Sequence, residues 1–193
     1  GLDLVTGVQH YEEEVRGSRF TVAASSFFQV NTSQLSRAVD EVRELLELRG
    51  DEVMVDAYCG VGVFAVLMSP YVKRVVGIEE SVSAIEDANL NLNGATNVEF
   101  IEGKTEHVMA DWQDEDSVDV LLLDPPRVGC HPDVLESVKK LQPKKVLMIS
   151  CEPAAMARDL DLLCDGGMYK LDTVRPVDMF PQTRHVETIS VLS

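Results

Sequence analysis

The sequence predicts an α/β fold in which a doubly wound, mostly parallel sheet ends in a C-terminal antiparallel hairpin. Between residues 53 and 163, short apolar runs alternate with stretches of helical periodicity. Strands separated by crossover helices pair in parallel and carry helices on their faces. The alternation stops near the end, where two strand-like segments follow each other with no convincing helix between them. The chain of 193 residues is long enough for one well-buried domain.

The first thirty residues read as extended segments rather than as the start of this sheet. Leu2–Gln9 and Arg19–Ala24 are rich in β-formers, and Gly17-Ser18 between them predicts a hairpin turn. The chain begins with Gly1 and looks like a fragment or a trimmed chain. We therefore expect residues 1–30 to be the remnant of a preceding unit plus a connector, and residues 31–193 to form the main domain.

The elements of the main domain follow in order. An amphipathic helix is expected over Thr32–Leu48, because apolar residues recur there at helical spacing, with Asn31 or Thr32 as N-cap and Gly50 as stop. The expected strands are Val53–Ala57, Arg74–Ile78, Val98–Ile101, Val118–Leu123 and Lys145–Ser150. The expected helices begin near Val61 and Thr105 or span Ser81–Leu92, Pro132–Leu141 and Pro153–Leu163. The closing hairpin is expected over Tyr169–Pro176 and His185–Leu192.

Composition excludes several classes of protein. Apolar residues make up 45% and charged residues 26%, as in an ordinary globular domain. No apolar run approaches the roughly 20 residues that a membrane-spanning helix needs. The cysteines contain no CxxC pair, which argues against a zinc, iron–sulfur or disulfide framework and for reduced thiols in a cytoplasmic protein. They are Cys59, Cys130, Cys151 and Cys164.

The chain is strongly acidic. Its formal net charge is −16 at pH 7, from 17 basic and 33 acidic side chains. The surface as a whole therefore repels phosphate backbones. A role on nucleic acid requires a local basic path or another domain.

A glycine-rich turn follows the first parallel strand, where α/β sheets hold nucleotide-like ligands. The segment Asp56–Phe64 contains Gly60 and Gly62, which let the backbone approach a ligand closely. Glu79 ends the next strand and is placed to accept hydrogen bonds from two ribose hydroxyls. A nicotinamide dinucleotide and S-adenosylmethionine could both use this geometry.

Two residues favour S-adenosylmethionine over the dinucleotide. Ala65 stands where a dinucleotide fingerprint has its third glycine. Asp56, just before the loop, would repel a pyrophosphate, whereas its carboxylate could accept a hydrogen bond from the amino group of methionine. The alternative is that the glycine-rich turn binds no ligand and only makes a tight connection between strand and helix. The presence of Glu79 at the end of the next strand disfavours this alternative.

Three later segments carry candidate chemistry. Asp124-Pro125-Pro126-Arg127 follows the fourth strand as a rigid loop, at the edge where ligands bind in open α/β sheets. Cys151 ends the fifth strand before a helix whose positive end favours a nucleophilic thiolate, and we expect the other cysteines to be inert. Near the C-terminus, His185 and Glu187 share one face of an extended segment, so either could point to a site while Val186 packs behind.

These segments together resemble the RNA uracil-5-methyltransferases, which make 5-methyluridine in tRNA and rRNA with S-adenosylmethionine. The resemblance covers essentially the whole chain but only the catalytic part of the family's enzymes, so we expect their N-terminal RNA-binding β-barrel and most of a central domain to be absent. Glu152 departs from the family pattern, which usually has Asn or Asp there. The segments that carry the resemblance are Ser26–Asn31, Asp56–Gly62, Asp124–Gly129, Ser150–Pro153 and Phe180–Glu187.

The resemblance implies a class I, Rossmann-like methyltransferase domain over residues 31–193, preceded by the last strands of a central domain. It implies Cys151 as nucleophile and Glu187 as general base. It also implies S-adenosylmethionine as cofactor, for which the candidate binding residues are Gln29, Tyr58, Gly60, Gly62, Glu79 and Asp124.

The implied mechanism is covalent. C5 of uracil is a poor nucleophile until a thiolate, from Cys151, adds to C6 and creates an enolate that can take a methyl group at C5. Glu187 is suited to remove the C5 proton, after which the thiol is eliminated. The target base must leave its stack, and Arg127, Phe180 and Arg184 are candidates to hold the extruded RNA. The expected partner is tRNA or rRNA, bound through the full-length protein, with no membrane and no metal.

Three other functions stay open on the sequence. An RNA cytosine-5-methyltransferase also adds a cysteine to C6, but its pattern has a second cysteine after a proline, where this chain has Asp124-Pro125-Pro126. A non-catalytic RNA-binding or scaffold fragment is disfavoured by the charge of −16 and the lack of a basic stripe. A nicotinamide oxidoreductase is disfavoured by Ala65 and by the thiol at the site.

Overall fold

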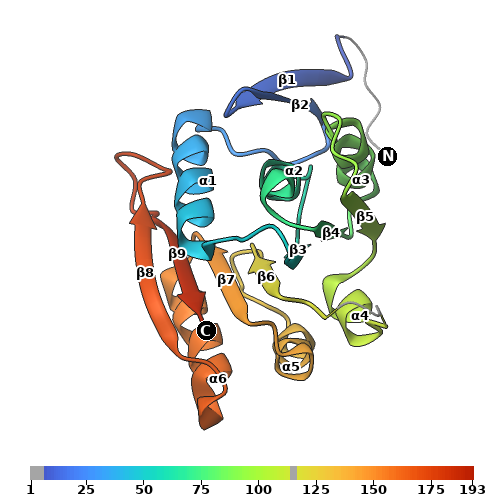
Figure 1. The fold of residues 1–193 in the computed structure, drawn as a ribbon. Coiled ribbons are helices and arrows are strands. Elements are labelled where there is room, and N and C mark those ends of the chain that lie inside the picture. Colours follow the sequence, from blue (N-terminus) through green and yellow to red (C-terminus); the bar gives the residue numbers. More distant parts are fainter. Residues whose placement is uncertain (1–6, 114–116) are drawn as a thin grey trace.

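The computed structural model describes residues 7–113 and 117–193 of the chain. Within them a seven-stranded sheet has the order β5-β4-β3-β6-β7-β9-β8 (Figure 1). The first five strands in this order are parallel, and β9 pairs antiparallel with both β7 and β8. This confirms the predicted doubly wound sheet with an antiparallel C-terminal hairpin. The strands are β3 Val53–Ala57, β4 Arg74–Glu79, β5 Val98–Glu102, β6 Val120–Leu123, β7 Lys145–Ser150, β8 Leu171–Val177 and β9 Glu187–Leu192.

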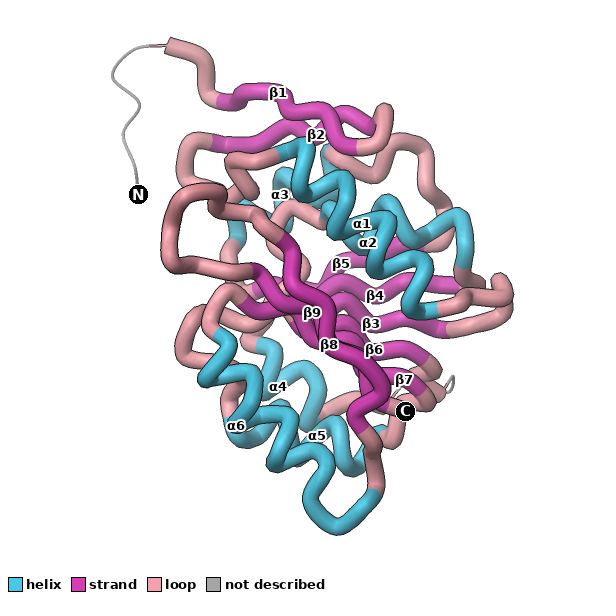
Figure 2. Tube along the Cα trace, turned by 90° about the vertical axis from the view of Figure 1, so that its left-hand side faces the viewer, coloured by secondary structure: helices cyan, strands magenta, loops and turns pink. Residues whose placement is uncertain are grey.

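Helices cover both faces of the sheet. In Figure 2, α1, α2 and α3 lie on one face, whereas α4, α5 and α6 lie on the other. The α-helices are α1 Thr32–Leu46, α2 Val63–Met68, α3 Val82–Leu90, α4 Thr105–Ala110, α5 Pro132–Leu141 and α6 Pro153–Cys164. Two short 3-10 helices are η1 Ser69–Tyr71 and η2 Asp165–Gly167. No helix in the described part of the chain is long and apolar enough to cross a lipid bilayer.

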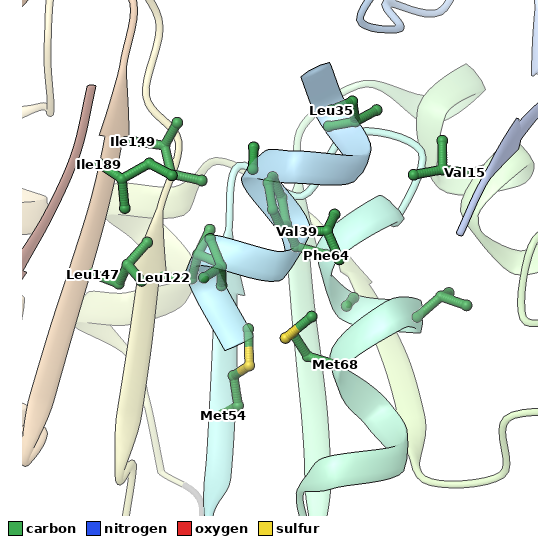
Figure 3. Close-up of a cluster of buried hydrophobic side chains, with 14 of the residues drawn as sticks. Val15, Leu35, Val39, Met54, Phe64, Met68, Leu122, Leu147, Ile149 and Ile189 are labelled. Atoms are coloured by element: carbon green, nitrogen blue, oxygen red, sulfur yellow. The ribbon is translucent and has the colours of Figure 1, made fainter. Parts of the chain in front are cut away.

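Two hydrophobic cores result from the alternation of side chains along the strands. In β6, Leu122 belongs to the core under α1 and α2, while its neighbours Leu121 and Leu123 belong to the core over α5 and α6. The first core joins Leu35 and Val39 of α1 to side chains of the strands (Figure 3). Other members labelled there are Met54, Phe64, Met68, Leu147, Ile149 and Ile189.

The N-terminal hairpin is displaced from its predicted position. Its strands are β1 His10–Val15 and β2 Ser18–Ala23, so the predicted strand over Leu2–Gln9 is wrong in its described part, residues 7–9. The predicted turn is also shifted by one residue. Arg16 (φ 53°) and Gly17 (φ 80°) form the two-residue loop, which needs positive φ at both positions to match the twist of the strands.

Weak local propensity explains this error. The strand β1 contains three consecutive glutamates at positions 12–14, and glutamate is depleted in strands. Pairing with β2 and packing on the helices override that preference. Asp87 of α3 accepts the N–H of Ala23 (2.8 Å), and Asn91 accepts the N–H of Thr21 (2.7 Å) while donating to the carbonyl of Val61 (3.1 Å). The hairpin is therefore bonded to the main domain close to the glycine turn.

The amphipathic helix ends earlier than predicted. Asn31 is its N-cap, and its side chain accepts the N–H of Gln34 (3.2 Å). Glu47 takes the left-handed conformation at the C-cap, so α1 ends at Leu46 rather than Leu48. Asn31 also donates to the carbonyl of Met179 (3.1 Å), which ties the start of α1 to the segment before β9.

Candidate active site

A cavity of about 1300 Å³ opens at the carboxyl edge of the parallel strands. The strand order reverses between β3 and β6, and such a switch point is where α/β sheets form a ligand crevice. Most predicted site residues line this cavity: Gln29, Tyr58, Gly60, Glu79, Asp124, Arg127, Cys151, Phe180 and Glu187. Gly62 and Arg184 lie outside its lining.

A second hollow of about 630 Å³ lies at the other edge of the sheet. Its lining includes Tyr71 and Asn97, which stand just before β4 and β5 begin. The charged groups there are paired with one another, for example Arg16 with Asp40 at 2.9 Å. The candidate chemistry is therefore confined to the larger cavity.

The glycine turn between β3 and α2 borders the larger cavity. Tyr58 (φ 66°), Gly60 (φ 53°) and Gly62 (φ 83°) all have positive φ, a conformation that glycine adopts without strain. A Cβ atom on Gly60 would meet no atom within 4 Å, whereas one on Gly62 would lie 2.8 Å from the ring of Phe100. Gly62 thus allows close packing beneath the turn, and Gly60 leaves space above it. Tyr58, a non-glycine residue held in this conformation, is an outlier of the kind found at binding sites.

Asp56 is buried beneath the turn, with 1% of its surface exposed. Its Oδ2 accepts the N–H of Ala65 (2.9 Å), while Oδ1 has no hydrogen-bond partner among the described residues. Burial, with a smaller contribution from the charge of Glu79, raises the pKa of Asp56 to about 7. A buried acceptor without a partner is costly, so this oxygen suits a donor group from a ligand.

Glu79 stands at the end of β4 and holds the turn in place. Its Oε2 accepts the N–H of Gly60 (3.1 Å), and its Oε1 accepts the N–H of Ser81 (2.8 Å). A carboxylate has about four acceptor sites, so further donors can bind. Glu79 lines the cavity, and its bond to Gly60 links the acid to the turn.

Asp124 follows β6 and is bonded to the neighbouring strand through its backbone, because its N–H donates to the carbonyl of Ala57 (3.4 Å). Burial raises the pKa of the Asp124 carboxyl well above its ordinary value, and the charges of Glu187 and Asp56 act in the same direction. Asp56, Asp124 and Glu187 therefore lie in one cavity, whose lining also contains Glu79. Its interior suits a cationic or donor-rich ligand and opposes an anionic one.

Cys151 and Glu187 both line the cavity, at the end of the β7–β9 pair. Ser150 and Thr188 are the last paired residues of this antiparallel ladder, and Cys151 and Glu187 each come one residue further. Glu187 is 2% exposed, and its Oε2 has no hydrogen-bond partner within the described chain. Burial raises the pKa of Glu187 to about 7. Cys151 is half-buried.

The backbone around Cys151 also accommodates the residue that departs from the family pattern. Glu152 is the N-cap of α6, but its side chain makes no capping hydrogen bond. Instead, the N–H of Glu152 donates to the hydroxyl of Ser150 (3.1 Å). The hydroxyl of Ser150, the last residue of β7, thus fixes the backbone on the C-terminal side of Cys151.

Gln29 completes the cavity on the side of the connector before α1. Its Oε1 is buried without a hydrogen-bond partner in the part of the chain that the structure describes. Its neighbour Phe28 is buried in the core and packs against Phe20, with ring centroids 6.2 Å apart. Phe28 and Gln29 both line the cavity, so this connector forms part of its wall.

The predicted substrate-side residues divide into two groups. Arg127 is exposed at the cavity, and Phe180 lines it with the ring of His185 edge-on at 6.2 Å. Arg184 is exposed and lies outside the lining. Of the candidates His185 and Glu187, only Glu187 lines the cavity. The prediction that Val186 packs behind is wrong, since 39% of its surface is exposed.

The other cysteines have surroundings of ordinary buried thiols. Burial raises the pKa of Cys59 and of Cys130 well above the usual value for a thiol, which disfavours the reactive thiolate. Cys164 is half-buried at the end of α6. Among the described residues, no cluster of three or more His, Cys, Asp or Glu side chains could hold a metal ion.

The sequence reasoning missed Arg158 and Asp159 of α6, which also line the cavity. A signal was present, because Asp159 lies at helical spacing among the buried residues of α6. The others on that face are Ala155, Met156, Leu160 and Leu163. A charged residue on an apolar helix face is unusual unless it is paired.

The chain's own groups fit S-adenosylmethionine. The sulfonium and ammonium groups of S-adenosylmethionine are cationic, and its ribose hydroxyls and amino groups can donate hydrogen bonds. The buried oxygens of Gln29, Asp56 and Glu187 that lack partners among the described residues are all acceptors and line one cavity. The pyrophosphate of a dinucleotide would face the repulsion of these acids.

A doubly wound sheet of this strand order, closed by an antiparallel pair, defines the class I methyltransferase fold. The chain itself belongs to the tRNA (uracil-5-)-methyltransferase family, since the family model described as "tRNA (Uracil-5-)-methyltransferase" matches residues 8–193.

Similar proteins agree with this family. A protein of Listeria innocua named as an uncharacterized RNA methyltransferase is 42% identical over 185 residues, which are 94% of this chain and 41% of that protein. A protein of Thermosynechococcus vestitus with the same description is 41% identical over 192 residues, covering 98% of this chain and 42% of that protein. The chain thus spans about two fifths of the length of these relatives.

The structure of the Pyrococcus abyssi tRNA (uracil-54, C5)-methyltransferase in complex with S-adenosyl-L-homocysteine is also similar. The two share 29% sequence identity and a TM-score of 0.82, over 97% of this chain and 45% of that chain.

Proposed function

We propose that this chain is the catalytic part of an S-adenosylmethionine-dependent RNA methyltransferase that methylates C5 of a uridine in tRNA or rRNA. Residues 31–193 form the catalytic domain in this proposal, and residues 1–30 are the last strands of a preceding domain plus a connector. The observation that carries the proposal is the meeting of Cys151 and Glu187 in the same cavity as the glycine turn and Glu79. Family membership supports the uracil specificity.

The cofactor is held by residues on the β3–β4 side of the cavity. Gly60 and Gly62 shape the turn, and Glu79 accepts hydrogen bonds from the ribose with the acceptor sites that its two backbone partners leave free. Asp56 and Gln29 accept from the methionine part, and this is supported by the buried oxygen of each that lacks a partner among the described residues. The other two residues of the proposed set, Tyr58 and Asp124, line the same cavity. When bound, S-adenosylmethionine supplies an electrophilic methyl group.

Cys151 acts as the nucleophile toward the uracil ring. Its thiolate forms a bond to C6, and the electron pair of the C5–C6 double bond moves toward O4 as an enolate, which makes C5 nucleophilic. The half-buried position of Cys151 at the cavity allows contact with a base that enters from outside. After methylation of C5, the C5 proton leaves and the C6–sulfur bond breaks, which restores the double bond and the thiolate.

Glu187 accepts the C5 proton. A general base works best with a pKa near the operating pH, and burial raises the pKa of Glu187 to about 7. This role is supported by the position of Glu187 and Cys151 in the lining of the same cavity, each one residue beyond the last pair of the β7–β9 ladder. One carboxylate can then complete the elimination without a metal ion.

The RNA contacts proposed here are those of Arg127, Phe180 and Arg184. Arg127 and Phe180 border the cavity from two different loops, as expected of groups that flank an extruded base. Arg184 lies outside the lining and is suited to a phosphate farther along the strand. With a net charge of −16, the chain needs further RNA affinity from elsewhere in the intact protein.

Nucleoside analysis tests the proposed function. The intact protein is incubated with S-adenosylmethionine and unmodified tRNA or rRNA transcripts, and the digested RNA is examined by mass spectrometry. We expect 5-methyluridine from the wild type and none from Cys151→Ala. Formation of 5-methylcytidine, or of no methylated base with either RNA class, would contradict the proposal.

A further inference from the structure

We propose that Arg158 and Asp159 of α6 are positioning residues that hold the substrate side of the loop between β6 and α5 beside Cys151. This inference rests on the function proposed above. We call this pair the Arg158–Asp159 clamp, and the segment that it holds, residues 126–130, contains Arg127.

The acid of the clamp binds the loop directly. Asp159 is 1% exposed, and its Oδ2 accepts the N–H of Cys130 at 2.7 Å. Its Oδ1 accepts from Nε (2.9 Å) and Nη2 (2.6 Å) of Arg158. Each oxygen of this buried carboxylate is therefore in a charge-assisted or short hydrogen bond.

The arginine of the clamp binds the same loop at a second point. Nη2 of Arg158 donates to the carbonyl of Val128 at 2.9 Å. Residues 128 and 130 are thus held on both sides of Gly129, which has a φ of +89°. A Cβ atom at Gly129 would lie 2.3 Å from Nη2 of Arg158 and 2.5 Å from Oδ2 of Asp159. The approach is so close that only glycine fits.

Fold stability alone does not account for this pair. Asp159 is 1% exposed, whereas 54% of the Arg158 side chain is exposed, so the desolvation cost of this pair falls on the carboxylate. An apolar residue at position 159 would avoid that cost. Asp159 occupies the apolar face of α6, where such a residue would pack against Met156 and Leu160. What the ion pair adds is a fixed position for two backbone groups of the loop.

One helix thereby joins the nucleophile to the substrate loop. α6 begins two residues after Cys151, and the N–H of Met156 donates to the carbonyl of Glu152 (3.1 Å) in its first turn. The clamp lies one turn further along the same helix. Arg127 therefore keeps its place relative to Cys151 as long as the clamp is intact. The other end of the loop is fixed independently, because Asp124 is bonded to Ala57 of β3.

Thiol labelling tests the clamp without reference to activity. Cys130 is 5% exposed, so it reacts slowly with an alkylating reagent while the loop is held. In Asp159→Asn we expect its alkylation rate, followed by peptide mass mapping, to rise by about tenfold or more, because a charge-assisted bond is lost. Besides burial, the charge of Asp159 raises the pKa of the Cys130 thiol, so the same rise in alkylation rate is required of Gly129→Ala, which keeps that charge. Asp87→Asn is the matched control. Asp87 is also 1% exposed and accepts a backbone N–H, that of Ala23, but it lies on the opposite face of the sheet.

Kinetics test the positioning role in the intact protein. We expect kcat for 5-methyluridine formation to fall by about 10- to 100-fold in Asp159→Asn, because small displacements of reacting groups are costly. The affinity for S-adenosylhomocysteine should stay within about twofold of the wild type, since the residues on the β3–β4 side are untouched. A variant that disturbed only the fold would weaken both together.

Gly129→Ala provides a second route if Asp159→Asn fails to fold, because it opens the clamp while keeping both charged residues. An alkylation rate of Cys130 equal to wild type in the folded variant, or normal kcat despite faster alkylation, would overturn the clamp. The proposed function fails if the wild-type protein makes no 5-methyluridine. The labelling of Cys130 does not depend on that activity, so the two failures can be distinguished.

Discussion

Cys151 and Glu187 each stand one residue beyond Ser150–Thr188, the last pair of the antiparallel β7–β9 ladder, and both line the same cavity. The insertion of β9 between β7 and β8 therefore joins two groups that are far apart in the sequence. This relationship supports the roles of nucleophile and base that we propose for them.

The first prediction concerns cofactor affinity. Glu79→Ala removes a carboxylate that lines the cavity and holds Gly60. We expect S-adenosylhomocysteine to bind more weakly by about 1.5–3 kcal/mol for each charge-assisted hydrogen bond lost. Isothermal titration calorimetry measures this loss, with the exposed Glu86→Ala as control for a change in net charge. Equal affinity in Glu79→Ala and the wild type would remove Glu79 from the cofactor site.

The second prediction uses the empty capping position before α6. Glu152 is the N-cap but makes no side-chain capping bond. Asn and Asp are among the best N-cap residues, and a good cap adds about 0.5–2 kcal/mol. Glu152→Asn should therefore raise the free energy of unfolding by about 1 kcal/mol, measured by urea denaturation. An unchanged or lower value would show that an Asn side chain at this position does not cap the first turn of α6.

The third prediction concerns the pH dependence of stability. The pKa of Glu187 is about 7 in the fold and 4.5 in the reference state, so the folded protein binds its proton more tightly. The stability that this protonation contributes is fully present below pH 4.5 and is lost as the pH rises to about 7. Above that pH the wild type carries a buried charge.

Glu187→Gln removes this charge while keeping the shape. Each pKa unit corresponds to about 1.4 kcal/mol. We therefore expect Glu187→Gln to gain about 2 kcal/mol in unfolding free energy relative to wild type between pH 5 and pH 8. Urea denaturation at pH 5 and at pH 8 measures this gain in unfolding free energy. Glu86→Gln, a substitution of an exposed residue, should show no such gain. A difference between variant and wild type that is independent of pH would mean that the Glu187 carboxyl titrates normally.

The parts of the fold that the sequence predicts well are those with a single strong pattern. The limits of β3, β7 and α5 agree with the expected ranges, since apolar runs and helical periodicity leave few alternatives there. The N-terminal strand was misplaced because its glutamates have low strand propensity and are held by pairing and packing. Long-range contacts of this kind have no local signal.

In the candidate site, too, positions with a local sequence signal could be predicted and positions set by long-range contacts could not. Glu79, Asp124 and Cys151 stand at the ends of parallel strands, so their shared edge could be predicted from the strand order alone. The meeting of Cys151 with Glu187 depends on which strand lies between β7 and β8, which periodicity does not reveal. The bond between Asp159 and the backbone of Cys130 is equally invisible, because backbone partners leave no trace in residue types.

The central claim is tested most directly by looking for a stalled covalent intermediate. The intact Glu187→Gln protein keeps Cys151, so the thiol can add to C6 and C5 can be methylated, but the C5 proton has no base to receive it. We predict that a protein–RNA adduct of raised mass accumulates on a denaturing gel when S-adenosylmethionine and substrate RNA are both present. Adduct should decrease without S-adenosylmethionine, because simple addition to C6 reverses readily, and Cys151→Ala should form none. Normal turnover by Glu187→Gln, or an adduct in Cys151→Ala, would contradict the assignment of these two residues.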